Sequence, residues 1–431
     1  MKQQPNLLRR DLAIEGGTPV RSTPLPLEFP GAHYMDAEEV EAVTRVVRSR
    51  STFRYYGLDP QRETETFELE FAKFIGVEHA LATSSGTGAL HTALGALGVG
   101  PGQEIIVPAY LWVSVVAAVV NLGAIPVLAD IDDTFCLDPA AVRSQITPRT
   151  RGIILIHMSG APGDVAAIAE IARERRLFLL EDCAQCAGGT IDGRKVGSFG
   201  DMAIFSFQMN KNMTSGEGGC VVTNDLKLYR RAVACHDLGY ARDEEGRLIF
   251  DDPELCLWGR GYRMDELRAS VLRVQLRKLP ETTRHMRDSK YRIRKALARF
   301  EDVSLRRILD PTGDTGCFLI ATYPNNGIAR AVNAAMRAEG IVTFEQGLSN
   351  VLMSDWGLHL YYNNLSLVAR RGPAWELPAN EGSLRDYSKG VCPFADSLFE
   401  RSVLIPIPSC LTQQDEDDII LAFEKSLSAI L

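Results

Sequence analysis

The chain has 431 residues, of which 45% are hydrophobic and 24% are charged, and its formal net charge is −8. This composition is typical of a globular protein with two or three domains, and the acidic balance argues against a nucleic-acid-binding surface. The longest apolar stretch, residues 113–122, contains Asn121 and is too short to span a bilayer. Because the N-terminal residues lack the apolar core of a signal peptide, we expect a cytoplasmic protein.

Nine cysteines are scattered along the chain. Several of them, such as Cys136, Cys220 and Cys235, lie in apolar runs, which indicates buried thiols rather than a disulfide framework. Cys183 and Cys186 form a CxxC pair, but no second pair or HxxxH follows at the spacing of a zinc site. We therefore expect two small buried residues and no metal.

The first 44 residues are predicted to form an extended arm and the start of the first helix. The arm is rich in proline and glycine, and Asp36 is a plausible N-cap for a helix that runs to about Arg48. A second helix is predicted over residues 63–75, where Phe67, Phe71 and Phe74 recur at helical spacing. These aromatic residues are interpreted as core anchors rather than as a ligand site.

From residue 79 onward, short apolar strands alternate with helices. The pattern predicts strands over 79–83, 104–110, 126–131, 152–158, 177–182 and 202–207, and helices over 89–97, 113–122, 139–144 and 165–175. Such alternation is typical of a mostly parallel sheet with helices on both faces, so the fold class is α/β. Ligands of these sheets bind outside the carboxyl ends of the strands.

Several polar residues follow these strands. The turn at residues 84–88, SSGTG, opens a helix whose free N–H groups would suit a phosphate, although it is neither a Walker loop nor a dinucleotide fingerprint. Trp112 is either a core residue or a stacking platform for a planar ring. His157 is either a satisfied rim histidine or a functional one. Asp182 ends a buried strand, which is costly unless the carboxylate meets a cation.

Lys211 lies between the apolar run at residues 202–207 and the pair Val221 and Val222, beside the small polar turn TSGEGG. Burial there would favour loss of the lysine proton and make the amine a nucleophile for carbonyl groups. A phosphate cradle, a stacking aromatic ring, an acid for a protonated ring nitrogen and a nucleophilic lysine are together what pyridoxal phosphate requires.

The motifs that carry this set resemble a known family. SSGTGALHTAL, EDCAQCAGG, GYRMDELRASVLRVQLRKL and above all the SFxxxKxxTxGEGG pattern at residues 206–219 are similar to the DegT/DnrJ/EryC1/StrS aminotransferases. The resemblance implies the aspartate aminotransferase fold (fold type I), with a mostly parallel seven-stranded sheet in a large domain and a smaller C-terminal α+β domain.

The resemblance also implies a role for each matching residue. Lys211 would hold pyridoxal 5'-phosphate as a Schiff base and move a proton during catalysis, and Asp182 would pair with the pyridine nitrogen. Gln185 would approach the phenolic oxygen of the ring, and Trp112 would stack on the ring. Three further residues would hold the phosphate, namely Gly86, Thr87 and Ser206. The implied reaction moves an amino group from glutamate or glutamine to a ketone.

The sequences FSFQ, GGTPVR and ASVLRVQL look closest to members that aminate inososes or make aminohydroxybenzoate. The expected acceptor is therefore a keto-sugar, a keto-cyclitol or a related ketone of secondary metabolism. A lyase, epimerase or decarboxylase that uses the same cofactor, and a non-catalytic binding protein, remain alternatives. The sequence departs from the family near the expected substrate, with Leu111 where threonine is usual and residues 158–160, MSG, where Leu-Tyr-Gly is usual.

The resemblance further implies a homodimer with active sites at the interface. The family usually has an asparagine that reaches the cofactor phosphate of the other subunit, and Gly261 occupies that place here. Either Arg260 or Arg263 takes over this contact, or the contact is missing.

The expected domains are the arm at residues 1–44, a large cofactor-binding domain at 45–286 and a small domain at 287–431. In the small domain we expect helices over 291–300 and 329–339, a strand-like segment after 340–343 and a final helix over 411–431 capped by Thr412. The aromatic stretch 354–383 either covers the active site or packs on the surface.

Overall fold

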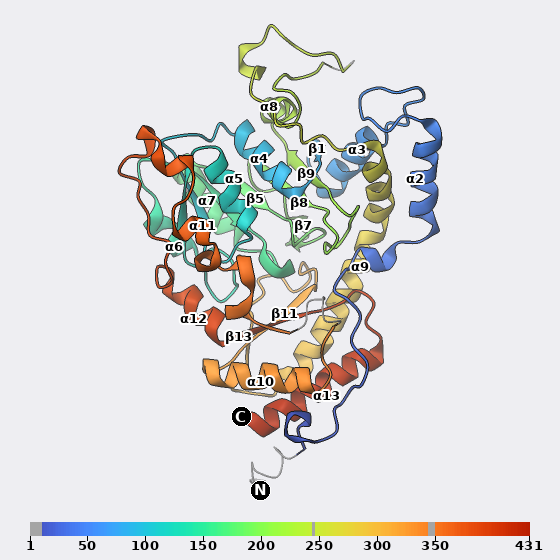
Figure 1. Ribbon diagram of the computed structural model, residues 1–431, viewed down its shortest axis with the longest axis vertical. Coiled ribbons are helices and arrows are strands. Elements are labelled where there is room, and N and C mark those ends of the chain that lie inside the picture. The colour runs from blue at the N-terminus through green and yellow to red at the C-terminus, as the bar shows by residue number, and fades with distance from the viewer. Residues whose placement is uncertain (1–10, 244–245, 344–349) are drawn as a thin grey trace.

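The computed structural model describes residues 11–243, 246–343 and 350–431, and it contains two main sheets packed with helices (Figure 1). The larger sheet has seven strands in the order β1 (His79–Thr83), β9 (Gly219–Thr223), β8 (Met202–Ser206), β5 (Phe178–Asp182), β4 (Thr150–Ile156), β2 (Glu104–Pro108) and β3 (Ile125–Ala129). Only β9 runs antiparallel to its neighbours, β1 and β8, within this sheet. The predicted seven-stranded, mostly parallel sheet is confirmed.

The helices of this part are α2 (Ala37–Ser49), α3 (Glu63–Ile75), α4 (Gly86–Ala96), α5 (Val113–Asn121), α6 (Pro139–Gln145), α7 (Val165–Arg175) and α8 (Leu226–His236). Helices α2 and α3 precede the sheet, and from β1 to β5 the helices follow the predicted alternation with strands. Asp36 caps α2 together with Glu39 in a capping box, as the acidic residues there suggest. Helix α4 begins earlier than the predicted residue 89, because the Ser85 side chain accepts from Gly88 N–H and caps the glycine-rich turn into the helix.

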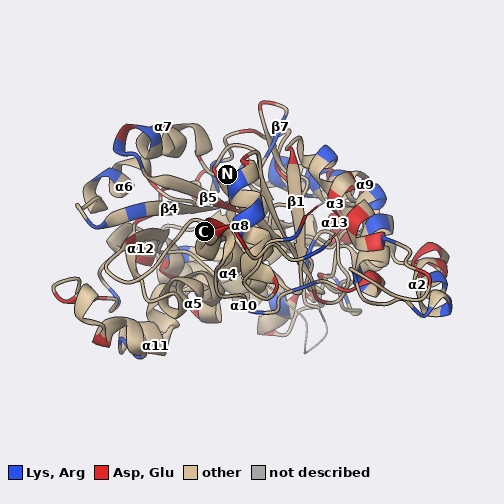
Figure 2. Cartoon of the chain, turned by 90° about the horizontal axis from the view of Figure 1, so that it is seen from above, with Lys and Arg blue, Asp and Glu red and all other residues tan. Residues whose placement is uncertain are grey.

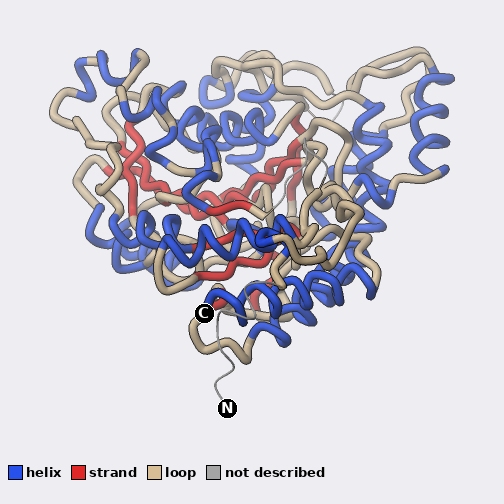
Figure 3. The backbone as a smooth tube through the Cα atoms, turned by 60° about the horizontal axis from the view of Figure 1, so that its bottom comes forward, coloured by secondary structure: helices blue, strands red, loops and turns tan. Residues whose placement is uncertain are grey.

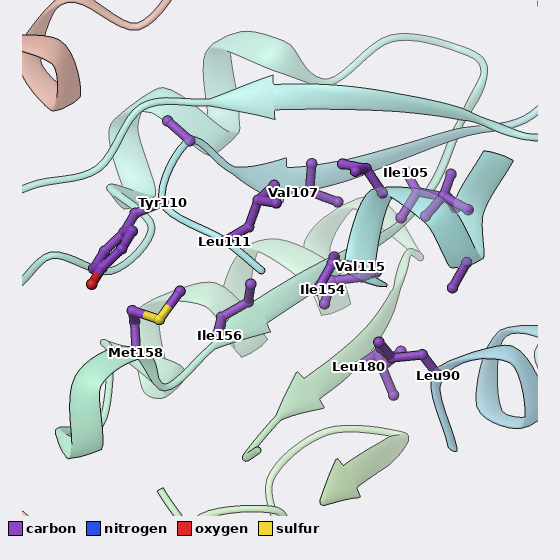
Figure 4. Packing of buried hydrophobic residues seen from close by; sticks show 14 of the residues in the cluster. Leu90, Ile105, Val107, Tyr110, Leu111, Val115, Ile154, Ile156, Met158 and Leu180 are labelled. Atoms are coloured by element: carbon purple, nitrogen blue, oxygen red, sulfur yellow. The ribbon is translucent and has the colours of Figure 1, made fainter. Parts of the chain in front are cut away.

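The central strands present alternate side chains to two helix-covered faces. Ile105 and Val107 of β2 pack in a cluster with residues of α4 and α5, part of which Figure 4 shows, whereas Ile106 packs with residues of α6 and α7. In β5, Leu180 belongs to the first cluster and Leu179 to the second. This follows from the two-residue period of a strand. Figure 3 shows the resulting sheet between layers of helices.

A third cluster joins α3 to the sheet edge formed by β1, β8 and β9. Phe67 and Phe71 are completely buried there and contact Phe207, and Phe71 also contacts Phe205 edge-on. The interpretation of the helix aromatics as core anchors is confirmed for these two residues, and Phe74 packs against the cluster from its margin.

The smaller sheet is antiparallel and has the strand order β10 (Ser304–Leu305), β11 (Phe318–Thr322), β13 (Ser402–Pro406) and β12 (Val351–Leu352). Helices α10 (Asn326–Ala338) and α13 (Gln413–Ile430) contribute to its core, and α12 (Pro393–Arg401) leads into β13. Thr412 caps α13 as predicted. The segment expected to be strand-like after 340–343 falls largely on residues 344–349, outside the described residues.

One long helix connects the two sheets. Helix α9 (Glu266–Leu297) packs against α2 and α3 through residues such as Leu272 and against α13 through residues such as Ile293. The prediction that a new helix starts at residue 291 is wrong, because residues 291–297 are the last part of α9, which begins at Glu266 and continues through Pro280. The helix crosses the expected boundary at residues 286–287, and the three-part division of the chain stays a prediction.

The segment between β12 and α12, which includes the aromatic stretch 354–383, is irregular. It contains only short helical turns, including those at Met353–Asp355, Gly357–His359 and Tyr361–Asn363, and the four-residue helix α11 (Leu365–Val368). A further hairpin, β6 (Thr190–Ile191) and β7 (Arg194–Lys195), stands apart from both sheets.

Charged residues of both signs are intermixed on the outer helices, for example on α2 and α9 (Figure 2). None of the helices in the described ranges is both long enough and apolar enough to cross a membrane. The nine cysteines are all free thiols, seven of them buried, in agreement with the expectation from their apolar surroundings.

Candidate active site

A cavity of about 800 Å³ opens at the carboxyl ends of β4, β5 and β8, beside the first turns of α4 and α5. Its walls include every residue that the sequence analysis placed in the cofactor site, namely Gly86, Thr87, Trp112, Asp182, Gln185, Ser206 and Lys211. Residues that are far apart in the chain meet here because parallel strands end at the same edge of a sheet.

One end of the cavity is built to accept an anion. The first N–H groups of α4, those of Gly86 and Thr87, have no partner within the helix, and the helix dipole adds positive potential at this end. The Ser206 side chain lies against Gly86 so closely that a Cβ atom at residue 86 would come within 2.7 Å of Ser206 Cβ. Only glycine fits at this position, and the cradle combines two backbone donors with one hydroxyl.

Asp182 lies in the cavity wall and is only 4% exposed. One carboxylate oxygen accepts from the N–H of Ala184 at 3.0 Å. Burial raises the pKa of this carboxyl, while the Ala184 hydrogen bond and the charge of Lys211 act in the opposite direction. A cation bound beside Asp182 would relieve the cost of burying the carboxylate, so the site suits a protonated ring nitrogen.

Lys211 borders the same cavity, in the loop between β8 and β9. Burial lowers the pKa of its ammonium group, and the negative charge of Asp182 opposes that shift. Among the described residues, the Lys211 amine has no hydrogen-bond or ion-pair partner. It is therefore a candidate nucleophile rather than one half of a salt bridge.

Trp112 and Gln185 complete the predicted set. Trp112 is 44% exposed and lines the cavity, which favours the stacking role over the core role that the sequence left open. The Gln185 side-chain oxygen accepts from Ser159 N–H at 2.9 Å, and the amide nitrogen lies 3.4 Å from His359 Nε2. Ser159 stands where the family usually has tyrosine, and its φ of 53° is in the left-handed region.

His157 is a structural residue instead of a cavity residue. Its Nδ1 accepts from Gly163 N–H, which leaves Nε2–H to donate to Glu181 Oε2 at 3.0 Å. Glu181 also accepts from three backbone N–H groups, those of Gly197, Phe199 and Gly200.

Cys183 lies close to the His157–Glu181 pair, and the three residues form a possible ligand cluster for a metal ion. The nitrogen and oxygen atoms are already used in this hydrogen-bond network, and burial raises the pKa of the Cys183 thiol well above its ordinary value. The arrangement favours the interpretation of Cys183 and Cys186 as small buried residues.

Replacing Glu181 by glutamine is expected to lower the free energy of unfolding by about 3 kcal/mol, because one partner of a buried charged network is lost. Burial raises the pKa of Glu181, but His157 and the backbone N–H groups outweigh it, and the net pKa is lowered from 4.5. The stabilisation is therefore complete above pH 4.5 and disappears as the pH falls through the lowered pKa. Urea unfolding at pH 7 and pH 4 measures both effects.

The exposed pair of Arg143 and Glu174 supplies the control for this experiment, since surface ion pairs contribute little. A Glu174→Gln variant should unfold at nearly the wild-type urea concentration. Equal losses from Glu181→Gln and Glu174→Gln would contradict the assigned role of Glu181.

The structure also brings residues of the C-terminal part of the chain to this cavity, and one of them, His359, was not predicted from the sequence. Trp356 and His359, in the irregular segment after β12, line it together with Phe318 and Cys317 of the smaller sheet. Trp356 belonged to the stretch that was expected either to cover the site or to pack on the surface, and it lies at the cavity. His359 belongs to no motif, and a single histidine in an irregular stretch gives no signal for its position.

The sequence profile of the DegT/DnrJ/EryC1/StrS aminotransferase family matches residues 33–344, well over half of the chain. The chain belongs to the DegT/DnrJ/EryC1/StrS aminotransferase family. Enzymes of this family depend on pyridoxal phosphate, and the resemblance noted from the motifs is confirmed.

Two curated members of the DegT/DnrJ/EryC1/StrS family show the subgroup that the chain resembles. It is 40% identical over 277 residues to the L-glutamine:2-deoxy-scyllo-inosose aminotransferase of Streptoalloteichus tenebrarius, which covers 63% of this chain and 64% of that protein. It is also 40% identical over 257 residues to the 3-amino-5-hydroxybenzoate synthase of Amycolatopsis mediterranei, over 59% of this chain and 64% of that one. The chain thus spans less than two thirds of the length of either relative.

Solved structures extend the similarity over most of the fold. The aminotransferase TlmJ from Streptoalloteichus hindustanus superposes with a TM-score of 0.75 at 26% identity, covering 96% of this chain and 100% of that one. A 3-amino-5-hydroxybenzoic acid synthase superposes with a TM-score of 0.73 at 29% identity, covering 92% and 97%. The expected fold type I architecture is confirmed by these neighbours.

Proposed function

We propose that this chain is a pyridoxal-phosphate-dependent aminotransferase. The observation that carries the proposal is the meeting, in one cavity, of three groups: a partly buried lysine whose amine has no partner among the described residues, a buried carboxylate, and an anion cradle at the start of α4. Lys211 would hold the cofactor aldehyde, Asp182 the pyridine nitrogen, and the cradle at Gly86, Thr87 and Ser206 the phosphate. Trp112 would stack on the ring, and Gln185 would donate to its phenolic oxygen.

The chemistry of the proposed reaction is divided between the cofactor and the protein. Pyridoxal phosphate, when bound, supplies an electron sink for charge that develops at the amino-bearing carbon. Asp182 would keep a proton on the ring nitrogen, which that electron sink requires. Lys211 Nζ, whose lowered pKa favours the free amine, would take up and return the proton at the reacting carbon.

The proposed amino donor is glutamate or glutamine, and the proposed acceptor is a keto-cyclitol, a keto-sugar or a related ketone. The support comes from relatives at about 40% identity, one of which is an L-glutamine:2-deoxy-scyllo-inosose aminotransferase and another a 3-amino-5-hydroxybenzoate synthase. Both similarities cover part of the chain, and the proposal therefore names the acceptor by its ketone group.

Reduction with borohydride after addition of pyridoxal phosphate tests the proposed function. We expect the cofactor to become covalently attached to Lys211, which mass spectrometry of the tryptic peptide would show. Adding glutamate or glutamine to the unreduced protein should then bleach the visible absorption of the cofactor. A cofactor that binds but is bleached by neither donor, nor by alanine, would indicate the lyase, epimerase or decarboxylase alternative instead.

We also propose a homodimer in which each subunit completes the cavity of the other. Lys211 is the only lysine or arginine among the described residues that line the cavity, whereas the amino donor carries a carboxylate that needs a cation. The loop between α8 and α9, yellow-green above α8 in Figure 1, exposes Trp258 (94%) and Phe250 (71%). We infer that these two side chains are buried by the second subunit, since a contiguous apolar surface is typical of an interface.

Two arginines on that loop were candidates for the contact that Gly261 cannot make. Arg263 forms an ion pair with Asp237, whereas Arg260 is exposed and is the candidate for reaching a second subunit. Sedimentation of the wild type should give a dimer, and Trp258→Glu should shift it toward the monomer. A fully active monomer would contradict this arrangement.

We also propose a cytoplasmic location, since nine free thiols suit a reducing compartment.

A further inference from the structure

His359 approaches the cavity from the C-terminal part of the chain, beyond the region that the family profile matches. Its main chain is anchored to the loop after β2, where the His359 carbonyl accepts from Leu111 N–H at 3.1 Å and Leu360 forms a bridge with Tyr110. The segment that carries His359 is therefore held against the large sheet by backbone contacts, and the imidazole has a defined position.

The imidazole ring is held by two tryptophans. It stacks on Trp356 with ring centroids 4.5 Å apart and an interplanar angle of 19°, and it lies 4.8 Å from Trp112 at 49°. Trp112 is the residue proposed to stack on the cofactor ring. His359 thus contacts the proposed stacking platform from the side of the C-terminal segment.

The hydrogen bonds around His359 determine which nitrogen carries its proton. The Trp356 carbonyl can only accept, so Nδ1–H of His359 donates to it at 3.3 Å. Burial and the charge of Lys211 lower the pKa of His359 to about 3, against the opposing effect of the Trp356 carbonyl, so the ring is neutral. A neutral imidazole has one donor and one acceptor, which leaves Nε2 as the acceptor.

Gln185 supplies the matching donor. Ser159 N–H can only donate, so it must meet the Gln185 oxygen, and the amide nitrogen then faces His359 Nε2 at 3.4 Å. The Ser159 N–H therefore holds the oxygen of the Gln185 amide, and the His359 ring holds its nitrogen. One N–H of the amide is used by His359, and the second is left for a ligand in the cavity.

We propose that His359 is a positioning residue that orients the Gln185 amide so that its remaining N–H points to the bound cofactor. This inference rests on the proposed function, because Gln185 is the residue expected to donate to the phenolic oxygen of the ring. His359 takes no part as an acid or base, since its acceptor nitrogen is occupied by Gln185 and its donor nitrogen by Trp356.

Two substitutions separate the hydrogen bond from the packing. His359→Phe keeps an aromatic ring between Trp112 and Trp356 but removes the acceptor. His359→Gln removes the aromatic ring but places an acceptor oxygen at the reach of Nε2. Tyr362→Phe, in the same segment, is the matched control, because the Tyr362 hydroxyl has no hydrogen-bond partner within the described part of the chain.

The measurements are the dissociation constant of pyridoxal phosphate and the visible absorption maximum of the protein-bound cofactor, with circular dichroism to confirm folding. We expect His359→Phe to weaken cofactor binding by roughly 3- to 10-fold, the effect of one lost hydrogen bond, and to shift the absorption maximum. His359→Gln should restore most of both properties, and Tyr362→Phe should match the wild type.

A double-variant cycle tests whether His359 acts through Gln185. Gln185→Leu should produce the same spectral shift as His359→Phe, and the double variant should show no further shift. The inference about His359 would be overturned if the His359→Phe protein had the absorption and cofactor affinity of the wild type. It would also be overturned if His359→Phe had the same effect in the Gln185→Leu background as in the wild type. Either result would leave the proposed function standing. A folded wild-type protein that takes up no cofactor would overturn the proposed function, and this inference with it.

Discussion

Lys211→Ala is expected to abolish the visible absorption of the bound cofactor and to lower turnover by at least about 1,000-fold. Two functions are lost together, the covalent attachment of the cofactor aldehyde and proton transfer at the reacting carbon, and the second alone contributes about 100- to 10,000-fold. The alanine side chain cannot form a carbon–nitrogen bond, so borohydride should attach no cofactor to the protein. Absorption spectra and single-turnover assays with glutamate measure both losses.

The control for this substitution is the same change at a lysine that lies on the surface, away from the cavity. Lys227 is exposed at the start of α8 and forms a surface ion pair with Glu254. Lys227→Ala should keep the absorption and turnover of the wild type. Lys211→Arg should be as inactive as Lys211→Ala, since a guanidinium keeps the charge but does not lose its proton. If the protein binds a ligand without catalysing a reaction, the wild type and the Lys211→Ala variant would both show no turnover.

Asp182→Asn is expected to lower turnover by about 100- to 1,000-fold while the cofactor-free protein stays at least as stable as the wild type. The carboxylate is the group that would hold a proton on the pyridine nitrogen, and an amide removes this electrostatic support. Because burial raises the pKa of Asp182, the charged carboxylate is disfavoured in the folded protein without cofactor, and the neutral amide relieves that cost.

Two assays on the same protein check this prediction, turnover with cofactor and urea unfolding without it. The neighbouring variant Glu181→Gln should give the reverse pattern, a large loss of stability with the cofactor site intact. A strong loss of stability in Asp182→Asn, with activity retained, would contradict the assignment of Asp182 to the cofactor.

Much of the large sheet could be predicted from local pattern. The strand at residues 79–83 and the helices at 63–75 and 165–175 have the predicted bounds, because apolar periodicity, glycine and capping residues mark their ends. That the residues proposed to hold the cofactor line one cavity could be predicted, because polar side chains after consecutive parallel strands converge on one edge of the sheet. The role proposed for Lys211 rests on that convergence and on the SFxxxKxxTxGEGG motif.

The misses have physical causes as well. The helix expected to start at residue 291 is the last part of α9, which continues through Pro280 because its first half packs on α2 and α3 and its second half packs on α13. His359 could not be assigned because its position depends on contacts with Leu111, Trp112 and Gln185, which are more than 170 residues away in the chain. Tertiary contacts of this kind leave no periodic signal in an irregular segment.

The alternation of side chains along β5 limits where the chain can tolerate an insertion or a deletion. Asp182 projects into the cavity and Glu181 into the hydrogen-bonded network on the other face of the sheet, although they are adjacent in sequence. Inserting or deleting one residue before Glu181 within β5 would turn both acids to the opposite faces of the sheet, Glu181 toward the side of the cavity and Asp182 toward the side of the network. Changes of length can therefore be accommodated in the turn before Phe178 but not between Leu179 and Asp182.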